Sequence, residues 1–146
     1  MSKNLNIPLI YIISIGFLLR AISIFLFRDV TVDFAGANEW GILLENLEEN
    51  EILSVRTVQG QLVPNIFMPP FYVFFLFIIK KFFLNLNIFL YAVQIIQLIL
   101  SLISIYLIYK ILINFFSKNI SYIGTIIFSV FPLNAYSISQ ISSISL

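Results

Sequence analysis

The sequence contains no cysteine and no histidine among its 146 residues. Their absence excludes disulfide bonds, thiolate nucleophiles, imidazole bases and the usual ligands of zinc. Any chemistry must therefore use carboxylates, Arg or Lys, hydroxyls or backbone groups. Charge is also scarce, at 10% of residues with a formal net charge of +1, and the Lys and Arg residues are not clustered. A nucleic-acid partner is therefore not expected.

Apolar residues are what the sequence has in excess. They make up 60% of the chain, and 16% of the chain is aromatic. A chain of this length cannot hide so much apolar surface in one small soluble core. We expect an all-α integral membrane protein with a single membrane domain, about four hydrophobic helices and the lipid bilayer as its partner.

Four hydrophobic runs are the predicted spans: residues 7–27, 66–84, 87–109 and 120–136. The first has the roughly 20 residues needed to cross a bilayer. It ends in bulky side chains and not in the small residues of a signal cleavage site, so we expect it to be retained. In the second, Pro69 and Pro70 suit a first helical turn and leave only about ten apolar residues before Lys80. This segment is predicted to be short or oblique.

The last two runs carry polar side chains at helical spacing. In the run 87–109 they lie on one face, at Tyr91, Gln94, Gln97, Ser101 and Ser104. In the run 120–136, hydroxyl residues recur every four positions beside a glycine, at Ser121, Thr125 and Ser129 with Gly124. Polar groups in lipid need partners, so both faces are predicted to pack against other helices.

The first loop, residues 28–65, contains all seven acidic residues of the chain. Trp40, Leu43, Leu44 and Leu47 follow an i, i+3, i+4, i+7 pattern and predict an amphipathic helix over residues 34–50. Its apolar stripe is expected to lie on the membrane interface or on the bundle of spans. The β-branched stretch after it, with a glycine near its middle, predicts a short hairpin or an extended return to the membrane.

Charge predicts which way the chain is oriented. The loop has only two basic residues, Arg28 and Arg56, whereas lysines mark the other boundaries. Basic residues favour the cytoplasmic side, so the acidic loop is expected to face the periplasm or exterior of a bacterial inner or plasma membrane. Four full spans would place Lys110 and Lys118 outside, and an incomplete second segment would place them inside. The sequence leaves both topologies open.

Several motifs, in order, resemble a known family. An Asp follows the first span, then come "EWGILLENL" (39–47), a Pro with "MPPFY" (68–72), and later "FPLNAYSISQISS" (131–143). This order is similar to the N-terminal part of the GT-C membrane glycosyltransferases, in the family 39-like branch that includes protein mannosyltransferases. The resemblance extends over nearly the whole chain but covers only the front of the family domain. It implies transfer of a sugar from a polyprenyl-phosphate-linked donor to a glycan, lipid or protein acceptor on the outer face.

The resemblance also implies which residues act. The Asp of the first outer loop, the family's catalytic carboxylate, matches Asp33, with Asp29 as the second choice. A carboxylate suits this chemistry because it can take the proton of the acceptor hydroxyl. The lipid phosphate leaves with negative charge, which a cation stabilises, and Arg28 and Arg56 are the loop's candidates. The acidic residues match no calcium-loop spacing, so no metal site is assigned and dependence on a divalent metal stays open.

Two positions depart from the family pattern. Some relatives have a basic residue before the Pro that opens the second span, where this chain has Met68. Many also have a second acidic residue after the fourth run, and the nearest position here is Ser145. Either the second carboxylate lies elsewhere or this branch works differently.

Other roles compete for each of these residues. Asp33 is also a good N-cap for the helix that follows it. Glu39 is a second candidate site carboxylate, and we expect Glu45, Glu48, Glu49 and Glu51 to form the solvated face of the helix. Arg20 lies inside the first span, where a charge costs at least ~2.5 kcal/mol unless it is paired. Substrate binding and snorkelling to the outer interface are equally good explanations for it.

Two other functions fit the same sequence. One is a non-enzymatic membrane subunit or scaffold whose acidic helix docks a partner, and the other is a transporter of lipid-linked sugars. The chain stops in a hydrophobic, hydroxyl-rich segment with no charged tail. We therefore expect a truncated sequence with further spans downstream.

Overall fold

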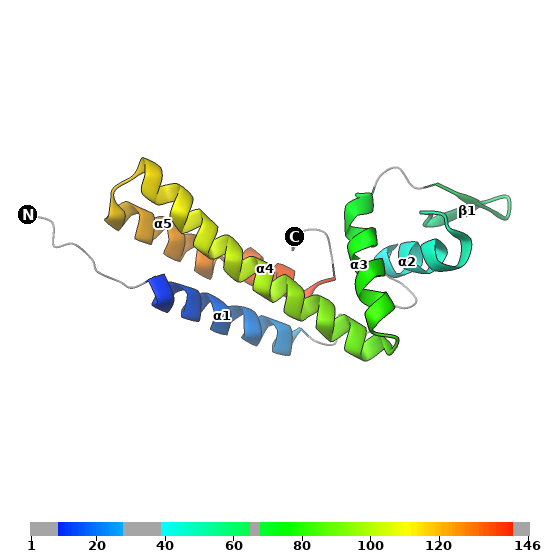
Figure 1. Cartoon of the computed structure of the whole chain (residues 1–146), viewed down its shortest axis with the longest axis horizontal. Coiled ribbons are helices and arrows are strands. Elements are labelled where there is room, and N and C mark those ends of the chain that lie inside the picture. The colour runs from blue at the N-terminus through cyan, green and yellow to red at the C-terminus, as the bar shows by residue number, and fades with distance from the viewer. Residues whose placement is uncertain (1–8, 28–38, 65–67, 142–146) are drawn as a thin grey trace, which may run out of the picture.

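The structure is a computed structural model that describes residues 9–27, 39–64 and 68–141 (Figure 1). Its elements in chain order are α1 (Leu9–Leu26), α2 (Glu39–Asn50), β1 (Arg56–Val58), β2 (Gln61–Val63), α3 (Pro70–Phe82), α4 (Leu86–Phe115), α5 (Lys118–Val130), α6 (Pro132–Tyr136) and the 3-10 turn η2 (Ser137–Ser139). The described part is mostly helical, as predicted. Its one sheet is the β1–β2 hairpin, a small addition to the all-α architecture that was expected.

Helices α1, α4 and α5 form a three-helix bundle (Figure 1). Gly16 of α1 lies against Ile105 of α4. One turn further along α1, Arg20 donates a hydrogen bond to Ser101, which lies one turn before Ile105 in α4. Helices α1 and α4 therefore run antiparallel. At the end of α1, the ring of Phe27 meets the ring of Tyr136 edge-on with centroids 4.9 Å apart, so α5 and α6 run in the same direction as α1.

These directions fix where the chain leaves and re-enters the bundle. Helix α1 ends at Leu26 and α4 begins at Leu86, both at the same end of the bundle (Figure 1). The turn between α4 and α5, which carries Lys110 and Lys118 at its edges, lies at the opposite end. Everything between Leu26 and Leu86 therefore begins and ends at one end of the bundle.

The polar face predicted on the fourth run is buried in this bundle. Ser121, Thr125 and Ser129 are all fully inaccessible. The hydroxyls of Ser121 and Thr125 donate to carbonyls four residues back, while Ser129 Oγ donates across to the carbonyl of Ile12 at 3.1 Å. The packing role is thus confirmed, because small hydroxyl residues allow close approach and still satisfy their hydrogen bonds.

The chain bends by 51° between α5 and α6. Pro132 has no N–H, so the carbonyl of Phe128 loses its helical donor. The side chain of Asn134 replaces that donor, with Nδ2 3.2 Å from the Phe128 carbonyl oxygen. Intramembrane helix breaks are tolerated where side chains satisfy the freed backbone groups in this way.

A second unit, made of α2, the hairpin and α3, packs on the first part of α4 (Figure 1). One hydrophobic cluster joins it: Trp40, Leu43, Leu44, Tyr72, Val73, Leu76, Ile79, Phe89, Leu90, Val93 and Ile141. The Asn85 side chain caps α4 by accepting from the N–H groups of Asn87 and Ile88 at 3.0 and 3.3 Å. We call α2 and the hairpin together the acidic module.

The amphipathic helix predicted in the first loop is present, and of the two alternatives for the stretch after it the structure shows the hairpin. Helix α2 is described from Glu39 to Asn50, and its apolar stripe packs on α3. Residues 34–38 of the predicted helix lie outside the described residues. The hairpin pairs Arg56 with Val63, and its turn places Gln59 and Gly60 at φ 53° and 78°. Such a turn explains the glycine in this stretch, since φ > 0 suits residues without a Cβ.

The span predictions are met only in part. In the described chain, α1 and α4 are each long and apolar enough to cross a membrane, and the bent pair of α5 with α6–η2 passes the same test together. Helix α3 has 13 residues, about 20 Å, which is too short to cross a ~30 Å core. Four full spans are therefore not found. Helix α4 continues past position 109 to Phe115, with Lys110 Nζ 5.6 Å from the ring centroid of Tyr106.

Candidate functional site

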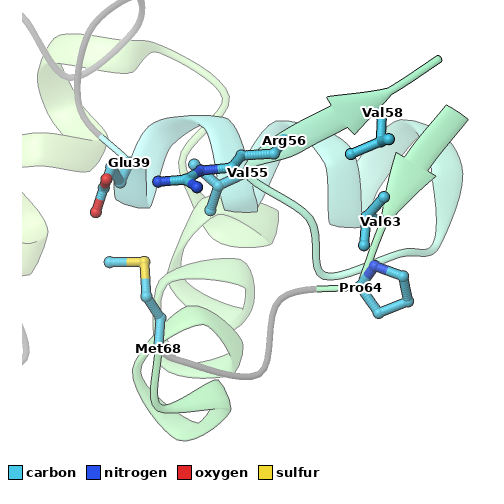
Figure 2. Close-up of a pocket in the computed structure, with 7 residues that line it drawn as sticks. All are labelled: Glu39, Val55, Arg56, Val58, Val63, Pro64 and Met68. Carbon is cyan, nitrogen blue, oxygen red and sulfur yellow. The ribbon is translucent and has the colours of Figure 1, made fainter. Parts of the chain in front are cut away.

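A cavity of about 520 Å³ opens beside the acidic module (Figure 2). It is lined by Glu39, Val55, Arg56, Val58, Val63, Pro64 and Met68. The start of α2, the hairpin and the segment leading into α3 each contribute residues. Its walls are mainly apolar, and its two charged groups have opposite signs.

Glu39 is held at the first residue of α2. The next residue, Trp40, is buried and packs edge-on against Tyr72 of α3, with ring centroids 4.8 Å apart. Leu43 and Leu44 bury the following turn in the same cluster. The apolar stripe thus fixes this turn of α2, and with it the position of Glu39.

Arg56 is held at the first residue of β1. Ser54, which is fully buried, has its Oγ 2.9 Å from the Arg56 carbonyl oxygen and 2.6 Å from that of Val63. Because a hydroxyl donates one proton at a time, Ser54 donates to either strand and closes the base of the hairpin. Asn46 of α2 then donates to the Ser54 carbonyl at 2.8 Å, which joins the hairpin to the helix that carries Glu39.

The guanidinium of Arg56 points toward the beginning of α2, where the side chain of Glu39 lies (Figure 2). Both residues are exposed, and neither side chain has a hydrogen bond or ion pair with any described residue. The carboxylate and the guanidinium are therefore both available to a ligand. An arrangement of this kind can accept a hydroxyl proton on one side and bind an anion on the other.

The structure brings together two of the five residues that sequence predicted for the site. Glu39 and Arg56 line the cavity, whereas Asp33 and Arg28 lie outside the described residues. Met68, which takes the place of a basic residue in some relatives, also lines the cavity. The remaining candidate, Arg20, is elsewhere.

Arg20 is fully buried inside the three-helix bundle and does not snorkel. Its Nε donates to Ser101 Oγ at 2.8 Å, and its Nη1 donates to the carbonyls of Gly16 and Ser129 at 3.1 and 2.8 Å. The bend after Val130 frees the Ser129 carbonyl from its helical donor. Arg20, on the neighbouring helix α1, thus donates to the carbonyl that the helix break leaves free. It is not part of the cavity.

The predicted polar face of α4 divides between two neighbours. Gln97 Nε2 donates to the Tyr72 hydroxyl at 2.9 Å, and Gln94 Nε2 donates to the Ser139 carbonyl at 3.0 Å. Together with Ser101, these contacts confirm the packing face for three of its five predicted members, whereas Tyr91 is exposed. Ser104 is exposed and donates to the Leu100 carbonyl of its own helix at 3.0 Å, so the face ends before it.

Sequence reasoning missed the contacts that position the site. The ion pair of Lys80 with Glu48 links α3 to α2, although both residues were predicted only as boundary or solvated charges. Ser54 and Asn46 had no distinguishing signal, because a lone hydroxyl or amide in a polar loop is common. Among residues 9–27, 39–64 and 68–141, no group of three His, Cys, Asp or Glu is placed to hold a metal ion.

Comparison with known proteins gives no relative for this chain. No family model, no curated protein and no solved structure matches it.

Proposed function

We propose that the chain is the N-terminal part of an integral membrane glycosyltransferase that uses a polyprenyl-phosphate-linked sugar. The observation that carries the proposal is the pairing of an unengaged carboxylate, Glu39, with an unengaged guanidinium, Arg56, at one cavity. The reaction needs these two kinds of group, a base for the acceptor hydroxyl and a cation for the departing phosphate. The family resemblance supplies the substrate class.

In this proposal Asp33 is the catalytic base, and Arg56 binds the lipid phosphate. Glu39 lies across the cavity from Arg56 and binds hydroxyls of the sugar or the acceptor. Arg28 is a second cation for the phosphate. Arg56 takes the part played by the basic residue that some relatives have at the position of Met68, since both positions line the cavity.

The cavity is proposed to face the periplasm or exterior. It lies with the acidic module at the end of the bundle where α1 ends, and Lys110 and Lys118 are at the opposite end. Lysines favour the cytoplasmic side, but Lys80 and Lys81 lie at the end of α3 beside the acidic module, so charge does not distinguish the two ends and the outward orientation rests on the family resemblance. Polyprenyl-phosphate sugars are used on that side by the family that the sequence resembles.

The test is transfer by the full-length protein in membranes, with a panel of polyprenyl-phosphate sugars and release of the carrier as the readout. Asp33→Asn is expected to lower transfer by roughly 10²–10⁴-fold, the contribution of a positioned base. Arg56→Gln is expected to lower it by roughly 10²–10³-fold, the cost of losing one stabilising charge. Both variants should insert into membranes normally.

Glu49→Gln is the matched control, because Glu49 is exposed on α2 and does not line this cavity. It should transfer like the wild type. Full activity of Asp33→Asn and Arg56→Gln would contradict the proposed roles. Carrier transport without transfer would instead identify a transporter, and binding of a partner through α2 with neither activity would identify a scaffold.

A further inference from the structure

Helix α3 has one apolar face that nothing in the described chain covers. Phe71, Phe74, Ile78 and Phe82 are 75%, 47%, 57% and 77% exposed, and they follow one another along one side of the helix. We call these four residues the aromatic stripe. The opposite side, Tyr72, Val73, Leu76 and Ile79, is buried against α2 and α4. A water-exposed surface rarely carries so large a run of exposed apolar side chains, so the stripe has an apolar partner.

The stripe does not belong to a helix that crosses the membrane. The chain leaves the bundle at Leu26 and re-enters at Leu86 at the same end, so α3 makes no net crossing (Figure 1). Its 13 residues span about 20 Å, less than a ~30 Å hydrocarbon core. It lies obliquely to α4 (Figure 1).

Charge and continuity point to lipid as the partner. Exposed apolar residues recur through the next turn, from Phe82 to Leu84, which is 93% exposed, and on to Leu86 and Ile88 of α4, which is long and apolar enough to cross a membrane. Lys80 and Lys81 stand at the end of α3, with Lys81 Nζ 4.4 Å from the ring centroid of Phe77. Lysines with apolar stems beside aromatic rings are typical of the headgroup region.

We propose that α3 is an interfacial helix that inserts its aromatic stripe into one leaflet and holds the acidic module at the membrane surface. The stripe faces acyl chains, while α2 lies on the other side of α3 and is joined to it by the Lys80–Glu48 ion pair. The bilayer thereby sets the height of the Glu39–Arg56 cavity above the membrane. This topology rests on the geometry of the chain and is independent of the glycosyltransferase activity.

The side of the membrane on which each segment lies is tested with single introduced cysteines. The native chain has no cysteine, so each variant carries only the introduced thiol. Gln61→Cys in the hairpin, Lys81→Cys at the end of α3 and Ser117→Cys between α4 and α5 are all exposed positions. An impermeant maleimide is added to one side of sealed membranes that contain the full chain. The thiol at position 81 should react from the same side as the one at 61 and from the opposite side to the one at 117. Reaction of 81 with the side of 117 would overturn the proposal.

Lipid contact is tested separately with a nitroxide on Ile78→Cys, and on Phe74→Cys should the first variant not fold. The chain is reconstituted in vesicles of phosphatidylcholine and phosphatidylglycerol, with labelled Glu49→Cys as the solvent-exposed reference. The stripe label should relax with oxygen and be shielded from a water-soluble nickel chelate, the reverse of position 49. Access of the chelate to the stripe, or shielding from both reagents, would overturn lipid as the partner.

Discussion

Substitution of Arg20 is the sharpest test of how the bundle holds a charge in a membrane. The guanidinium makes three hydrogen bonds, to Ser101 Oγ and to the carbonyls of Gly16 and Ser129, at 2.8, 3.1 and 2.8 Å. No described carboxylate lies within 4.0 Å of it. Arg20 is therefore a cation that backbone and hydroxyl oxygens solvate at Nε and Nη1, while its buried Nη2 has no hydrogen-bond partner and the guanidinium has no counter-ion in the described chain.

The two informative variants are Arg20→Met and Arg20→Lys. The Met variant leaves the Ser129 carbonyl without a donor, at a cost of about 1–3 kcal/mol. It also removes a buried charge that costs at least ~2.5 kcal/mol. These terms nearly cancel, so we expect a stability within about 1 kcal/mol of the wild type.

The Lys variant keeps the charge but loses the planar fork. One ammonium cannot reach both Ser101 and Ser129 in the geometry of a guanidinium, so at least one charge-assisted hydrogen bond is lost, at roughly 1.5–3 kcal/mol. We therefore expect the Lys variant to be about 2 kcal/mol less stable than the Met variant, although Lys is the closer residue in charge.

The measurement is equilibrium unfolding in mixed micelles titrated with dodecyl sulfate, followed by far-ultraviolet circular dichroism. A Lys variant as stable as the wild type would show that the simultaneous hydrogen bonds of the planar guanidinium to Ser101 and Ser129 do not contribute to stability. A Met variant less stable by more than roughly 3 kcal/mol would also refute the reasoning, because a loss of that size indicates a counter-ion left unpaired.

Two smaller predictions use the same unfolding assay, and a third uses transfer activity. Gly16→Ala should cost about 1–3 kcal/mol, because its Cβ would lie 2.5 Å from Ser129 Oγ, and Gly124→Ala should cost less, since it meets only a movable leucine methyl at 2.9 Å; equal losses would contradict this. Tyr72→Phe should cost roughly 1 kcal/mol by removing the acceptor of Gln97 Nε2, and no loss would show that the bond contributes nothing. Gly60→Val should lower the transfer activity of the full-length protein by distorting the hairpin that carries Arg56, since its φ of 78° is strained for valine and nothing lies within 4 Å, while Gly60→Asn should be mild; equal effects would exclude backbone strain.

Much of the local structure was predictable because it depends on patterns a few residues long. The i, i+3, i+4, i+7 stripe of Trp40, Leu43, Leu44 and Leu47 predicted α2, and the glycine in a β-branched stretch made the hairpin one of two alternatives. The four-residue spacing of Ser121, Thr125 and Ser129 gave a buried helix face. Each signal is local, since side-chain periodicity follows directly from helix or strand geometry.

The functions of two arginines were not predictable, because they depend on partners far away in the chain. The sequence favoured substrate binding and snorkelling equally for Arg20. Its actual contacts are 81 and 109 residues away, at Ser101 and Ser129. Arg56 reaches the cavity only because Ser54 and Asn46 tie the hairpin to α2.

By itself the sequence determined that the chain is rich in membrane-length apolar helices and that its acids are confined to one loop, because composition and periodicity depend on no distant contact. Only the tertiary structure decided that α1 and α4 are antiparallel, that α1 ends and α4 begins at the same end of the bundle, and that Glu39 and Arg56 line one cavity. The physical reason is that hydrophobicity drives a segment out of water but has no direction. The order and direction of helices follow from which polar groups, such as Arg20 and Ser129, find each other once the segments have packed.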